Sequence, residues 1–399
     1  MSEAKAWTRS EGADRVTQLF EESFGQVPDG VWSAPGRVNL IGEHTDYNGG
    51  LALPIALPHR TYVAVKKRDD RQVRLVSAQE DTLQTVDLDA VGPKGSTEQV
   101  DGWPAYIVGV AWAMKQDGNE LSGFDIAVDS CVPYGAGLSS SAALSGSVGV
   151  ALQDLFQVEA SREQIVQWCI TAENEIAGAP TGGMDQSASL RCQEGHAILL
   201  DSREHSLEHI LFDLSAAGLV LLVIDTKAPH SLVDGQYAAR RNTCHEAAAA
   251  LGVEYLADIT DLDAALRALD DPVARRRVRH VVTEIARTRQ AADLLQTEGS
   301  LSSVRGQVGA LFSQSHASLR DDYEVSCPEL DVAVATAESA GALGARMTGG
   351  GFGGSAIALV PESQVETVMN RVDEAFADSG FAAPEYLIVE ASGPAGKDR

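Results

Sequence analysis

Residues 133–143 read PYGAGLSSSAA, a glycine-rich turn followed by three serines and a run of small residues. Gly135 and Gly137 allow positive φ angles and a close approach of a ligand to the backbone. The serines are expected to begin a helix, whose first N–H groups and positive dipole end favour phosphate. A serine hydroxyl there can also coordinate Mg²⁺, which prefers oxygen ligands. From this stretch alone, a turn with a serine N-cap remains an equally simple interpretation.

The sequence on both sides of this turn predicts alternating strands and helices. Strands are expected from β-branched residues at period two or from short apolar runs, over residues 61–66, 72–76, 124–128, 219–225, 355–360 and 386–391. Helices are expected from apolar residues three and four positions apart, starting near residues 107, 139, 161 and 365 and running over much of 234–319. The arginine-rich part, residues 275–279, is interpreted as a solvated helix face.

The length of the chain indicates how these elements are grouped. A chain of 399 residues exceeds the usual size of a single hydrophobic core. We therefore predict an α+β fold in two lobes, residues 1–205 and 206–399.

A second glycine cluster, Gly349-Gly350-Gly351-Phe352-Gly353-Gly354, formally contains the G-x-G-x-x-G pattern. A dinucleotide site would need this pattern between a strand and a helix. The apolar, strand-like sequence SAIALV follows it instead. We therefore expect a loop whose backbone packs against a ligand or against the first glycine loop.

Polar side chains are concentrated in residues 36–50, which read GRVNLIGEHTDYNGG. Carboxylates accept hydrogen bonds from neighbouring sugar hydroxyls, and a histidine can donate or accept. The segment therefore suits recognition of a polyhydroxylated ligand, although each polar residue taken singly also fits a surface turn.

Two further carboxylates are candidates for chemistry. Asp185 lies in PTGGMDQSAS, two positions after a glycine pair, where an acid held by a tight loop can act as a base or stabilise charge. An Asx-turn explains the same stretch equally well. Glu173 lies at the edge of a predicted helix stripe and, taken alone, is interpreted as a solvated carboxylate.

Composition excludes several classes of function. The 57 acidic and 31 basic residues give a net charge of -26, which argues against a nucleic-acid partner because phosphate backbones need clustered Lys and Arg. The first residues contain no apolar core of a signal peptide, and no apolar run is long enough to span a bilayer. The five cysteines are widely spaced, as is usual for reduced thiols. We expect a cytoplasmic protein without a membrane partner.

Three separated segments together resemble one known family. GRVNLIGEHTDYNGG is similar to the galactokinase signature, PYGAGLSSSAA to the phosphate-binding motif of the GHMP kinases, and MTGGGFGGSAIAL to their third motif. Their order and spacing also match, and the resemblance extends over essentially the whole chain. It implies a two-lobed fold with mixed β-sheets flanked by helices and an active site in the cleft between the lobes.

The resemblance also implies a role for individual residues. Sugar contacts are implied for Arg37, Glu43, His44, Thr45, Asp46, Gly183, Asp185 and Tyr237. Contacts with ATP are implied for Ser77, Gly135, Ala136, Gly137, Leu138, Ser139, Ser140 and Ser141. Ser141 and Glu173 resemble the ligands of Mg²⁺.

The implied reaction is phosphorylation of the C1 hydroxyl of D-galactose by ATP. In phosphoryl transfer the protein mainly positions the reactants and stabilises charge. Asp185 is expected to take the hydroxyl proton and Arg37 to stabilise developing negative charge, although the arginine also weakens Asp185 as a base.

Two alternatives stay open. One is another GHMP kinase, acting on N-acetylgalactosamine, mevalonate or homoserine. The other is a regulator that binds sugar and ATP without turnover, against which the complete SSSAA segment and Asp185 argue. We expect a monomer, with a weak homodimer as the alternative.

Overall fold

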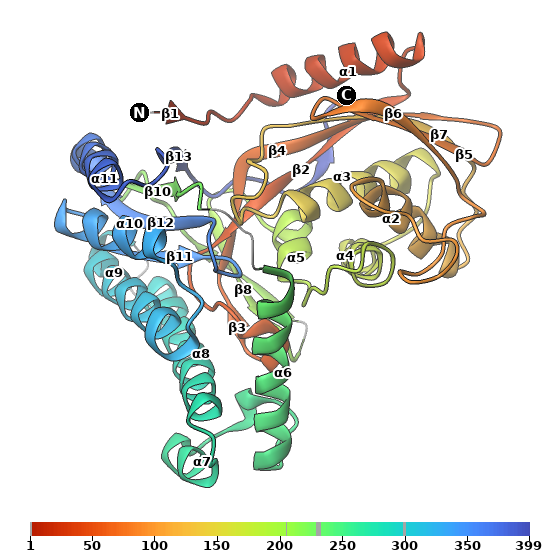
Figure 1. Ribbon diagram of the computed structural model, residues 1–399. Helices are drawn as coiled ribbons and strands as arrows, with labels where there is room; N and C mark the ends of the chain where they lie inside the picture. The colour runs from red at the N-terminus through yellow and green to blue at the C-terminus, as the bar shows by residue number, and fades with distance from the viewer. Residues whose placement is uncertain (1, 205, 229–232, 298–300) are drawn as a thin grey trace.

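Three β-sheets organise the part of the chain that the computed structural model describes, residues 2–204, 206–228, 233–297 and 301–399 (Figure 1). The strands are β1 (Ser2–Glu3), β2 (Gly30–Asn39), β3 (Leu51–Ala52), β4 (Pro54–Lys67), β5 (Gln72–Ser77), β6 (Glu80–Asp87), β7 (Phe124–Ser130), β8 (His196–Asp201), β9 (Ser206–Leu211), β10 (Leu219–Asp225), β11 (Gly344–Thr348), β12 (Ser355–Pro361), β13 (Glu385–Val389) and β14 (Gly396–Lys397). Their orders are β14-β2-β4-β7-β5-β6, β1-β13-β10-β12-β11 and β3-β8-β9.

Helices cover these sheets. They are α1 (Arg9–Phe24), α2 (Pro104–Gln116), α3 (Ser140–Leu155), α4 (Arg162–Thr171), α5 (Met184–Arg191), α6 (Val233–Leu251), α7 (Leu262–Ala268), α8 (Pro272–Thr297), α9 (Leu301–Ser318), α10 (Pro328–Ser339) and α11 (Val365–Ser379). Shorter turns are η1 (Asp46–Asn48), η2 (Ala172–Ala177), η3 (Leu256–Asp258), η4 (Leu319–Tyr323) and η5 (Glu362–Gln364), of which η2 and η4 are π-helical. In Figure 1, α2, α3 and α4 lie beside the six-stranded sheet, and α8 to α11 lie on the side of the five-stranded sheet.

Separate hydrophobic clusters hold the two regions. Ile126 of β7 packs with Ile107 of α2 and Trp168 of α4 in one cluster. Leu222 of β10 packs with Val372 of α11 in another. Each cluster joins one face of a sheet to the apolar stripe of its helices, which is how α+β layers exclude water from their core.

Most predicted elements are confirmed, with one division that the periodicity did not reveal. The expected strand over 219–225 coincides with β10, and the expected strand over 124–128 extends to Ser130. The helical stretch over 234–319 is instead broken into α6, α7, α8 and α9. Gly252 follows α6 with a φ of +70°, and Pro272 begins α8, where its missing N–H costs nothing.

The interpretation of residues 275–279 as a solvated face is wrong at one position. Arg277 is 3% exposed. Its guanidinium donates to the carbonyl oxygen of Asp322 at 2.5 Å and to the carboxylate of Glu324 at 2.6 Å. A guanidinium can be buried when its donors are satisfied in this way, and the mixed charge of the segment does not show it.

The two glycine clusters meet backbone to backbone, as expected. A Cβ atom added at Gly349 would lie 3.2 Å from the carbonyl oxygen of Gly137, and one at Gly354 would lie 3.2 Å from that of Ala136. Both glycines have positive φ, +84° and +79°. The Ser355 hydroxyl also donates to Ala136 at 2.7 Å. Side chains at these glycines would separate the two loops.

The ends of the described chain cross between the sheets. β1 pairs in parallel with β13 of the five-stranded sheet, whereas β14 pairs antiparallel with β2 of the six-stranded sheet. Figure 1 shows the N- and C-terminal ends at these two separate places.

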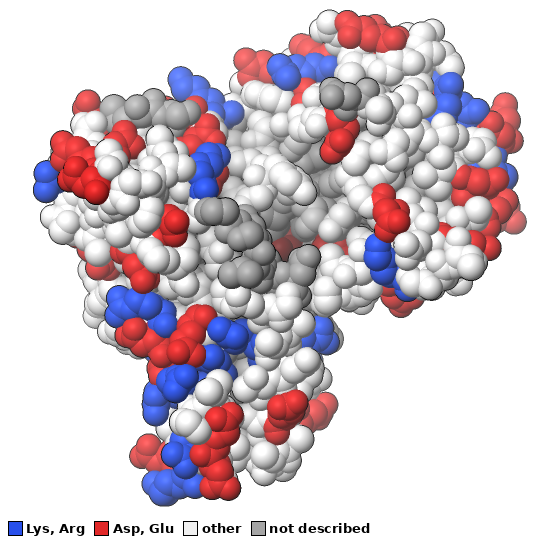
Figure 2. All heavy atoms as spheres, viewed as in Figure 1, with Lys and Arg blue, Asp and Glu red and all other residues white. Residues whose placement is uncertain are grey.

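The charged groups are distributed over the outer surface. Figure 2 shows acidic and basic side chains interspersed on the visible face, which is hollowed between the region of α2 to α4 and that of α8 to α11. Within the described residues, no helix combines the length and the apolar character needed to cross a membrane. All five cysteines lie in described positions and are free thiols.

Candidate active site

A pocket of about 190 Å³ lies at the junction of the loop after β2, the start of α5 and the glycine cluster after β11. Its walls are formed by Arg37, Glu43, His44, Asp46, Glu173, Ala179, Pro180, Thr181, Met184, Asp185, Tyr237, Gly349 and Gly350. Several polar groups converge in a small cavity, as in sites that recognise a small polar ligand.

A paired arginine and aspartate lie at the end of this pocket nearest to the phosphate-loop sequence. Arg37 Nε and Nη2 each donate at 2.8 Å to Asp185, one to each carboxylate oxygen. Arg37 Nη1 donates to the carbonyl oxygen of Gly137 at 2.7 Å. The Ser139 hydroxyl donates to Asp185 Oδ2. One buried guanidinium therefore fixes the carboxylate relative to the glycine loop.

Local backbone structure positions these groups. The register of β2 against β4 shifts between Pro35 and Arg37, and the Arg37 N–H donates outside the sheet to Leu138 O at 3.1 Å. Such an irregularity turns a side chain away from the sheet face. Asp185 is the second residue of α5, where the helix dipole stabilises a negative charge.

The start of α3 is open to a ligand. Ser139 precedes the helix with a φ of +58°, and its side chain caps none of the first N–H groups. Its hydroxyl donates to Asp185. Ala136 and Leu138 are buried, whereas Ser140 and Ser141 are partly exposed. Uncapped N–H groups at a helix start are donors for phosphate.

Glu173 brings a buried carboxylate to the same region. It lies in η2, is 5% exposed and accepts from the Ser145 hydroxyl at 3.3 Å. Burial, and then the charge of Asp185, raises the pKa of Glu173 to about 8. Ser141 lies one helical turn before Ser145, on the same face of α3.

These two oxygen groups suit a divalent cation. A buried carboxylate with a raised pKa lacks compensating positive charge, which a cation would supply. The described residues form no group of three or more His, Cys, Asp or Glu side chains able to hold a metal. Mg²⁺ usually takes only one or two protein ligands beside phosphate and water.

Asp46 offers a second carboxylate on the opposite loop. Burial is the main cause that raises its pKa to about 6, and the charge of Asp185 adds to it. A Cβ atom at Gly182 would lie 2.3 Å from the Asp46 carboxylate. Only glycine at position 182 therefore lets the loop before α5 approach this side chain so closely.

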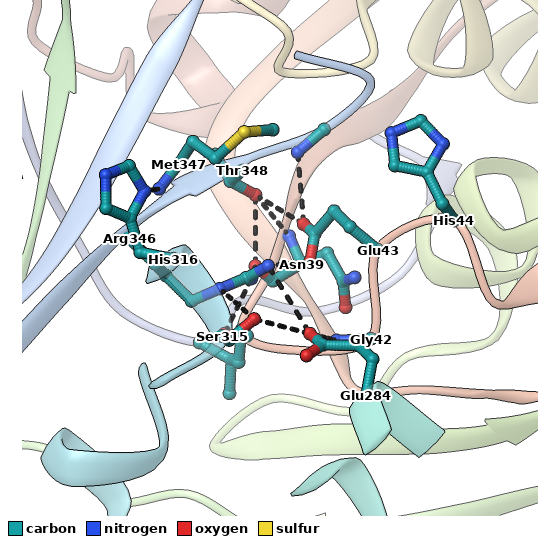
Figure 3. Close-up of polar contacts among 12 residues, drawn as sticks. Asn39, Gly42, Glu43, His44, Glu284, Ser315, His316, Arg346, Met347 and Thr348 are labelled. Carbon is teal, nitrogen blue, oxygen red and sulfur yellow. Dashed lines mark hydrogen bonds and ion pairs between the residues drawn. The ribbon is translucent and has the colours of Figure 1, made fainter. Parts of the chain in front are cut away.

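The Glu43 carboxylate is paired with a buried arginine, Arg346 (Figure 3). Arg346 is fully buried in β11; its Nη2 donates to Glu43, and its Nη1 donates to the carbonyl oxygens of Asn39 and Leu40 at 3.2 and 2.9 Å. The other Glu43 oxygen accepts from the Gly349 N–H at 3.1 Å. Burial raises the pKa of Glu43 despite the nearby Arg346 charge.

A second buried carboxylate completes this network. Glu284 of α8 accepts from the Gly42 N–H at 3.1 Å and from the Ser315 hydroxyl, and it lies 3.7 Å from Arg346 (Figure 3). Burial alone would raise its pKa, but the charges of Arg287 and Arg346 outweigh burial and lower it to about 2. The network ties the loop after β2 to α8 and β11.

His44 has both ring nitrogens engaged. Nδ1 lies 2.8 Å from the Tyr47 hydroxyl and Nε2 lies 3.2 Å from the carbonyl oxygen of Gly350. Burial lowers the pKa of His44 to about 3, so the ring is neutral at physiological pH. Tyr237 of α6 packs beside it with ring centroids 5.6 Å apart.

The structure brings most, but not all, of the expected sugar-contacting residues into the pocket. Arg37, Glu43, His44, Asp46, Asp185 and Tyr237 line it. Thr45 is fully buried behind the pocket, and its hydroxyl donates to the carbonyl oxygens of Gly42 and Leu51. Gly183 does not line the pocket but precedes α5 with a φ of +91°. Ser77, expected to contact ATP, ends β5 and bonds to Gln79.

Sequence reasoning missed the residues that support the loop. Arg346 is a charged residue within the wholly buried strand β11, and Glu284 lies on the buried face of α8 between Val281 and Thr288. The sequence signal available for both residues was a charge at a position that the apolar pattern assigns to the core. A buried charge requires a partner, so such a position points to a paired group. Thr181 and Met184 of the pocket wall carried no comparable signal.

Family comparisons agree with this geometry. The galactokinase galactose-binding signature matches residues 18–67, the GHMP kinases N-terminal domain matches 105–193, and the GHMP kinases C-terminal domain matches 298–378. The chain is 48% identical to a galactokinase of Streptomyces coelicolor, covering 97% of this chain and 98% of the relative. It is 43% identical to a galactokinase of the dog, covering 94% of each.

Solved structures extend the comparison to the fold. Lactococcus lactis galactokinase in complex with galactose superposes with a TM-score of 0.90 at 33% identity, covering 96% of this chain and 99% of that one. Methanococcus jannaschii mevalonate kinase gives 0.62 at 16% identity, covering 91% and 98%, which shows a shared fold alone.

Together these findings define the class as the GHMP kinases, enzymes that use ATP as co-substrate. The predicted two-lobed fold of mixed sheets and flanking helices is confirmed. Within that class, the chain belongs to the galactokinase family.

Proposed function

We propose that this enzyme transfers the γ-phosphoryl group of ATP to the C1 hydroxyl of D-galactose, giving galactose 1-phosphate. One observation carries the proposal: Asp185 of the sugar-sized pocket is bonded both to Arg37 and to Ser139, the residue that begins the phosphate-binding helix α3. The acceptor pocket and the phosphate site are therefore adjacent, which in-line transfer requires.

Sugar hydroxyls would be held by the polar walls of the pocket. Asp46, when ionised, accepts hydrogen bonds from neighbouring hydroxyls, and His44 supplies a neutral ring. Glu43 would act mainly through its remaining acceptor capacity, because Arg346, Thr348 and Gly349 already occupy both of its oxygens. We assign Thr45 and Gly183 to holding the loop and the start of α5.

ATP would lie against the glycine loop and the start of α3. The open N–H groups of residues 139–141 support phosphate binding there. Ser141 and Glu173 would hold Mg²⁺, which would supply positive charge against the phosphates of ATP. This local arrangement works against the net charge of -26, which repels a nucleotide at long range.

Asp185 and Arg37 would have different roles at the reacting hydroxyl. Asp185 Oδ1 accepts a hydrogen bond from Arg37 Nε, and its second lone pair can accept the C1 hydroxyl proton. The Arg37 guanidinium stabilises negative charge as it develops on the transferring group. We therefore propose Asp185 as base and Arg37 as charge stabiliser.

The proposal is tested by ADP release with Mg-ATP and D-galactose, beside glucose, N-acetylgalactosamine and mevalonate. Galactose-dependent turnover that is lost without Mg²⁺ is the expected result. Turnover only with another acceptor would keep the kinase and overturn the substrate. Binding of galactose and ATP without ADP release would indicate a sensor instead.

The base is tested separately with Asp185→Asn, which keeps the shape of the side chain. We expect kcat to fall at least about a hundredfold with galactose saturating, since a positioned base contributes 10²–10⁴-fold. Near-normal kcat would leave Asp185 as a positioning group only.

We propose lobes divided near residue 205, supported by the separate six- and five-stranded sheets; the division falls between β8 and β9, which pair with each other.

We propose a monomer in the cytoplasm, supported by free thiols and by the scattered positions of exposed large apolar side chains. Sedimentation at several concentrations distinguishes a monomer from a weak homodimer.

A further inference from the structure

A chain of hydrogen bonds leads from the pocket into the core of the C-terminal region. His44 Nδ1 lies 2.8 Å from the Tyr47 hydroxyl, and that hydroxyl lies 2.8 Å from the Tyr323 hydroxyl. The Tyr323 hydroxyl in turn lies 3.2 Å from Cys244 Sγ. Tyr323 and Cys244 are fully buried, so solvent does not compete for these contacts.

The direction of this chain follows from its first member. The carbonyl oxygen of Gly350 can only accept, so His44 Nε2, at 3.2 Å from it, carries the proton. A neutral imidazole has one N–H, and Nδ1 must therefore accept from the Tyr47 hydroxyl. Tyr47 then accepts from Tyr323, because each hydroxyl has a single proton to donate. Tyr323 accepts from the Cys244 thiol by the same reasoning.

Each member keeps the proton that this arrangement needs. Burial lowers the pKa of His44 to about 3, so the ring does not gain a second proton near neutral pH. Burial raises the pKa of Tyr47 and Tyr323 well above 10 and raises that of the Cys244 thiol. The series of hydrogen bonds therefore runs from the Cys244 thiol to the His44 imidazole, and none of its groups is ionised.

The backbone of His44 is held independently. Its φ of +63° is unusual for a residue other than glycine. The Asn48 amide donates to the His44 carbonyl oxygen at 2.8 Å. Figure 3 shows the His44 ring turned away from the Arg346 network, so that network does not set the orientation of the ring.

We propose that Tyr47, Tyr323 and Cys244 are positioning residues that, together with the Gly350 carbonyl, hold His44 in the Nε2–H form, so that the pocket offers the sugar a hydrogen-bond donor beside that carbonyl. Without a ligand Nε2–H donates to the Gly350 carbonyl oxygen at 3.2 Å, and a sugar hydroxyl that replaces this bond can accept from Nε2–H and donate to the carbonyl, since both residues line the pocket. A ring in the other tautomer would present two acceptors and would discriminate against the same hydroxyl. This inference rests on the proposed sugar-binding function.

The tautomer is measured directly on the full chain labelled with ¹⁵N-histidine. Nitrogen NMR distinguishes a protonated from an unprotonated ring nitrogen, and His44→Gln assigns the resonances. We expect Nε2 protonated and Nδ1 unprotonated in the ligand-free protein. Tyr47→Phe removes the donor to Nδ1 and is expected to give a mixture of tautomers. An Nδ1–H ring in the unaltered chain would overturn the proposal.

Kinetics test the consequence for the sugar. Tyr47→Phe and Cys244→Ala are expected to raise KM for galactose about fivefold, with kcat and KM for ATP within about twofold, because the lost contact serves ground and transition states alike. Cys244→Ser, whose hydroxyl can donate, is expected to restore KM. Unchanged KM in both variants would overturn the proposal.

A matched control separates positioning from stability. Tyr386→Phe removes a buried hydroxyl that bonds to Met369 and Asp373, far from the pocket-lining residues in the chain. It should lower Tm without changing KM for galactose. If the unaltered chain does not phosphorylate galactose, the proposed function fails, and the ¹⁵N measurement still decides whether the chain of hydrogen bonds fixes the tautomer.

Discussion

At the scale of single residues, the pocket is built from charges that are almost all paired inside the protein. Arg37 is bonded to Asp185, and Arg346 to Glu43. Asp46 and Glu173 differ: their pKa values are raised mainly by burial, and neither forms an ion pair with a cationic side chain among the described residues. The paired groups give the site its shape, and the uncompensated ones are available to ligands.

Replacing Arg346 with methionine tests the first group. The change leaves the Glu43 and Glu284 carboxylates buried near each other without their shared partner, so we expect the free energy of unfolding to fall by about 3–5 kcal/mol. Urea denaturation measures it. Arg371→Met is the control, because its pair with Glu374 is exposed and should contribute less than about 1 kcal/mol. Equal losses would show that Arg346 does not anchor the loop.

Asp46 sets a pH dependence whose sign can be stated. Its pKa is about 6 in the folded chain against an ordinary 3.8, so the folded state binds the proton more tightly. The stabilisation is complete below pH 3.8 and is lost as the pH rises through about 6. This loss amounts to about 2 kcal/mol between pH 4 and pH 7, and Asp46→Asn should remove most of it.

The ionisation of Asp46 should affect galactose binding in the opposite sense to its effect on stability. The ionised carboxylate accepts sugar hydroxyls, so KM for galactose should rise as the pH falls below about 6. Denaturation and kinetics at several pH values check both effects, with Asp69→Asn, an exposed carboxylate, as the control. A flat KM across this range would contradict the assignment.

At the scale of elements, the contact between the two glycine loops decides the geometry of phosphate binding. Gly349→Ala places a Cβ atom 3.2 Å from Gly137 O at a φ of +84°, so the loops must separate. We expect a loss of about 1 kcal/mol in stability from the left-handed backbone and a fall in kcat of at least about tenfold.

Gly218→Ala provides the matched control for the loop contact. Its φ of +63° is similarly unfavourable, but nothing lies within 4 Å of the added atom. It should lose comparable stability and keep full activity in the ADP-release assay. If the two variants lose activity equally, the contact between the loops is not required.

The elements also show how far sequence patterns reach. Strands such as β5 and helices such as α11 were predictable because burial of one face imposes periods of two and 3.6 residues. Arg37, His44, Asp46 and Asp185, chosen from the motifs, line one pocket in the structure. Arg277, Arg346 and Glu284 were not placed, because whether a charge is buried depends on partners from distant segments, such as Asp322 and Glu43.

At the scale of the whole molecule, the crossed ends of the chain join the two regions. β14 extends the six-stranded sheet beyond β2, and the Asp398 side chain, 1% exposed, pairs with Arg9 at 2.6 Å. The Asp398 N–H also donates to Val31 O at 2.8 Å. This pairing could not be predicted from sequence patterns, because a strand of two residues is too short to show a periodicity.

A variant that ends at Ala395 tests the contribution of this pairing. It loses β14, the Arg9 ion pair and the bond to Val31, and we expect the free energy of unfolding to fall by about 2–4 kcal/mol. kcat should stay within about twofold, because none of these residues lines the pocket. Lys397→Ser, which removes an exposed pair with Asp154 and a cation–π contact with Trp32 but keeps the backbone of β14, is the control. Unchanged stability on shortening would contradict the role of β14.

The same crossing has a consequence during synthesis. β2 is synthesised early, whereas β14 is synthesised only after every strand of the five-stranded sheet. Until then the outer edge of β2 has unpaired N–H and C=O groups, which are a template for pairing with another chain. Chaperone binding to the nascent enzyme is therefore expected to concentrate on this edge and to end when residues 396–397 emerge.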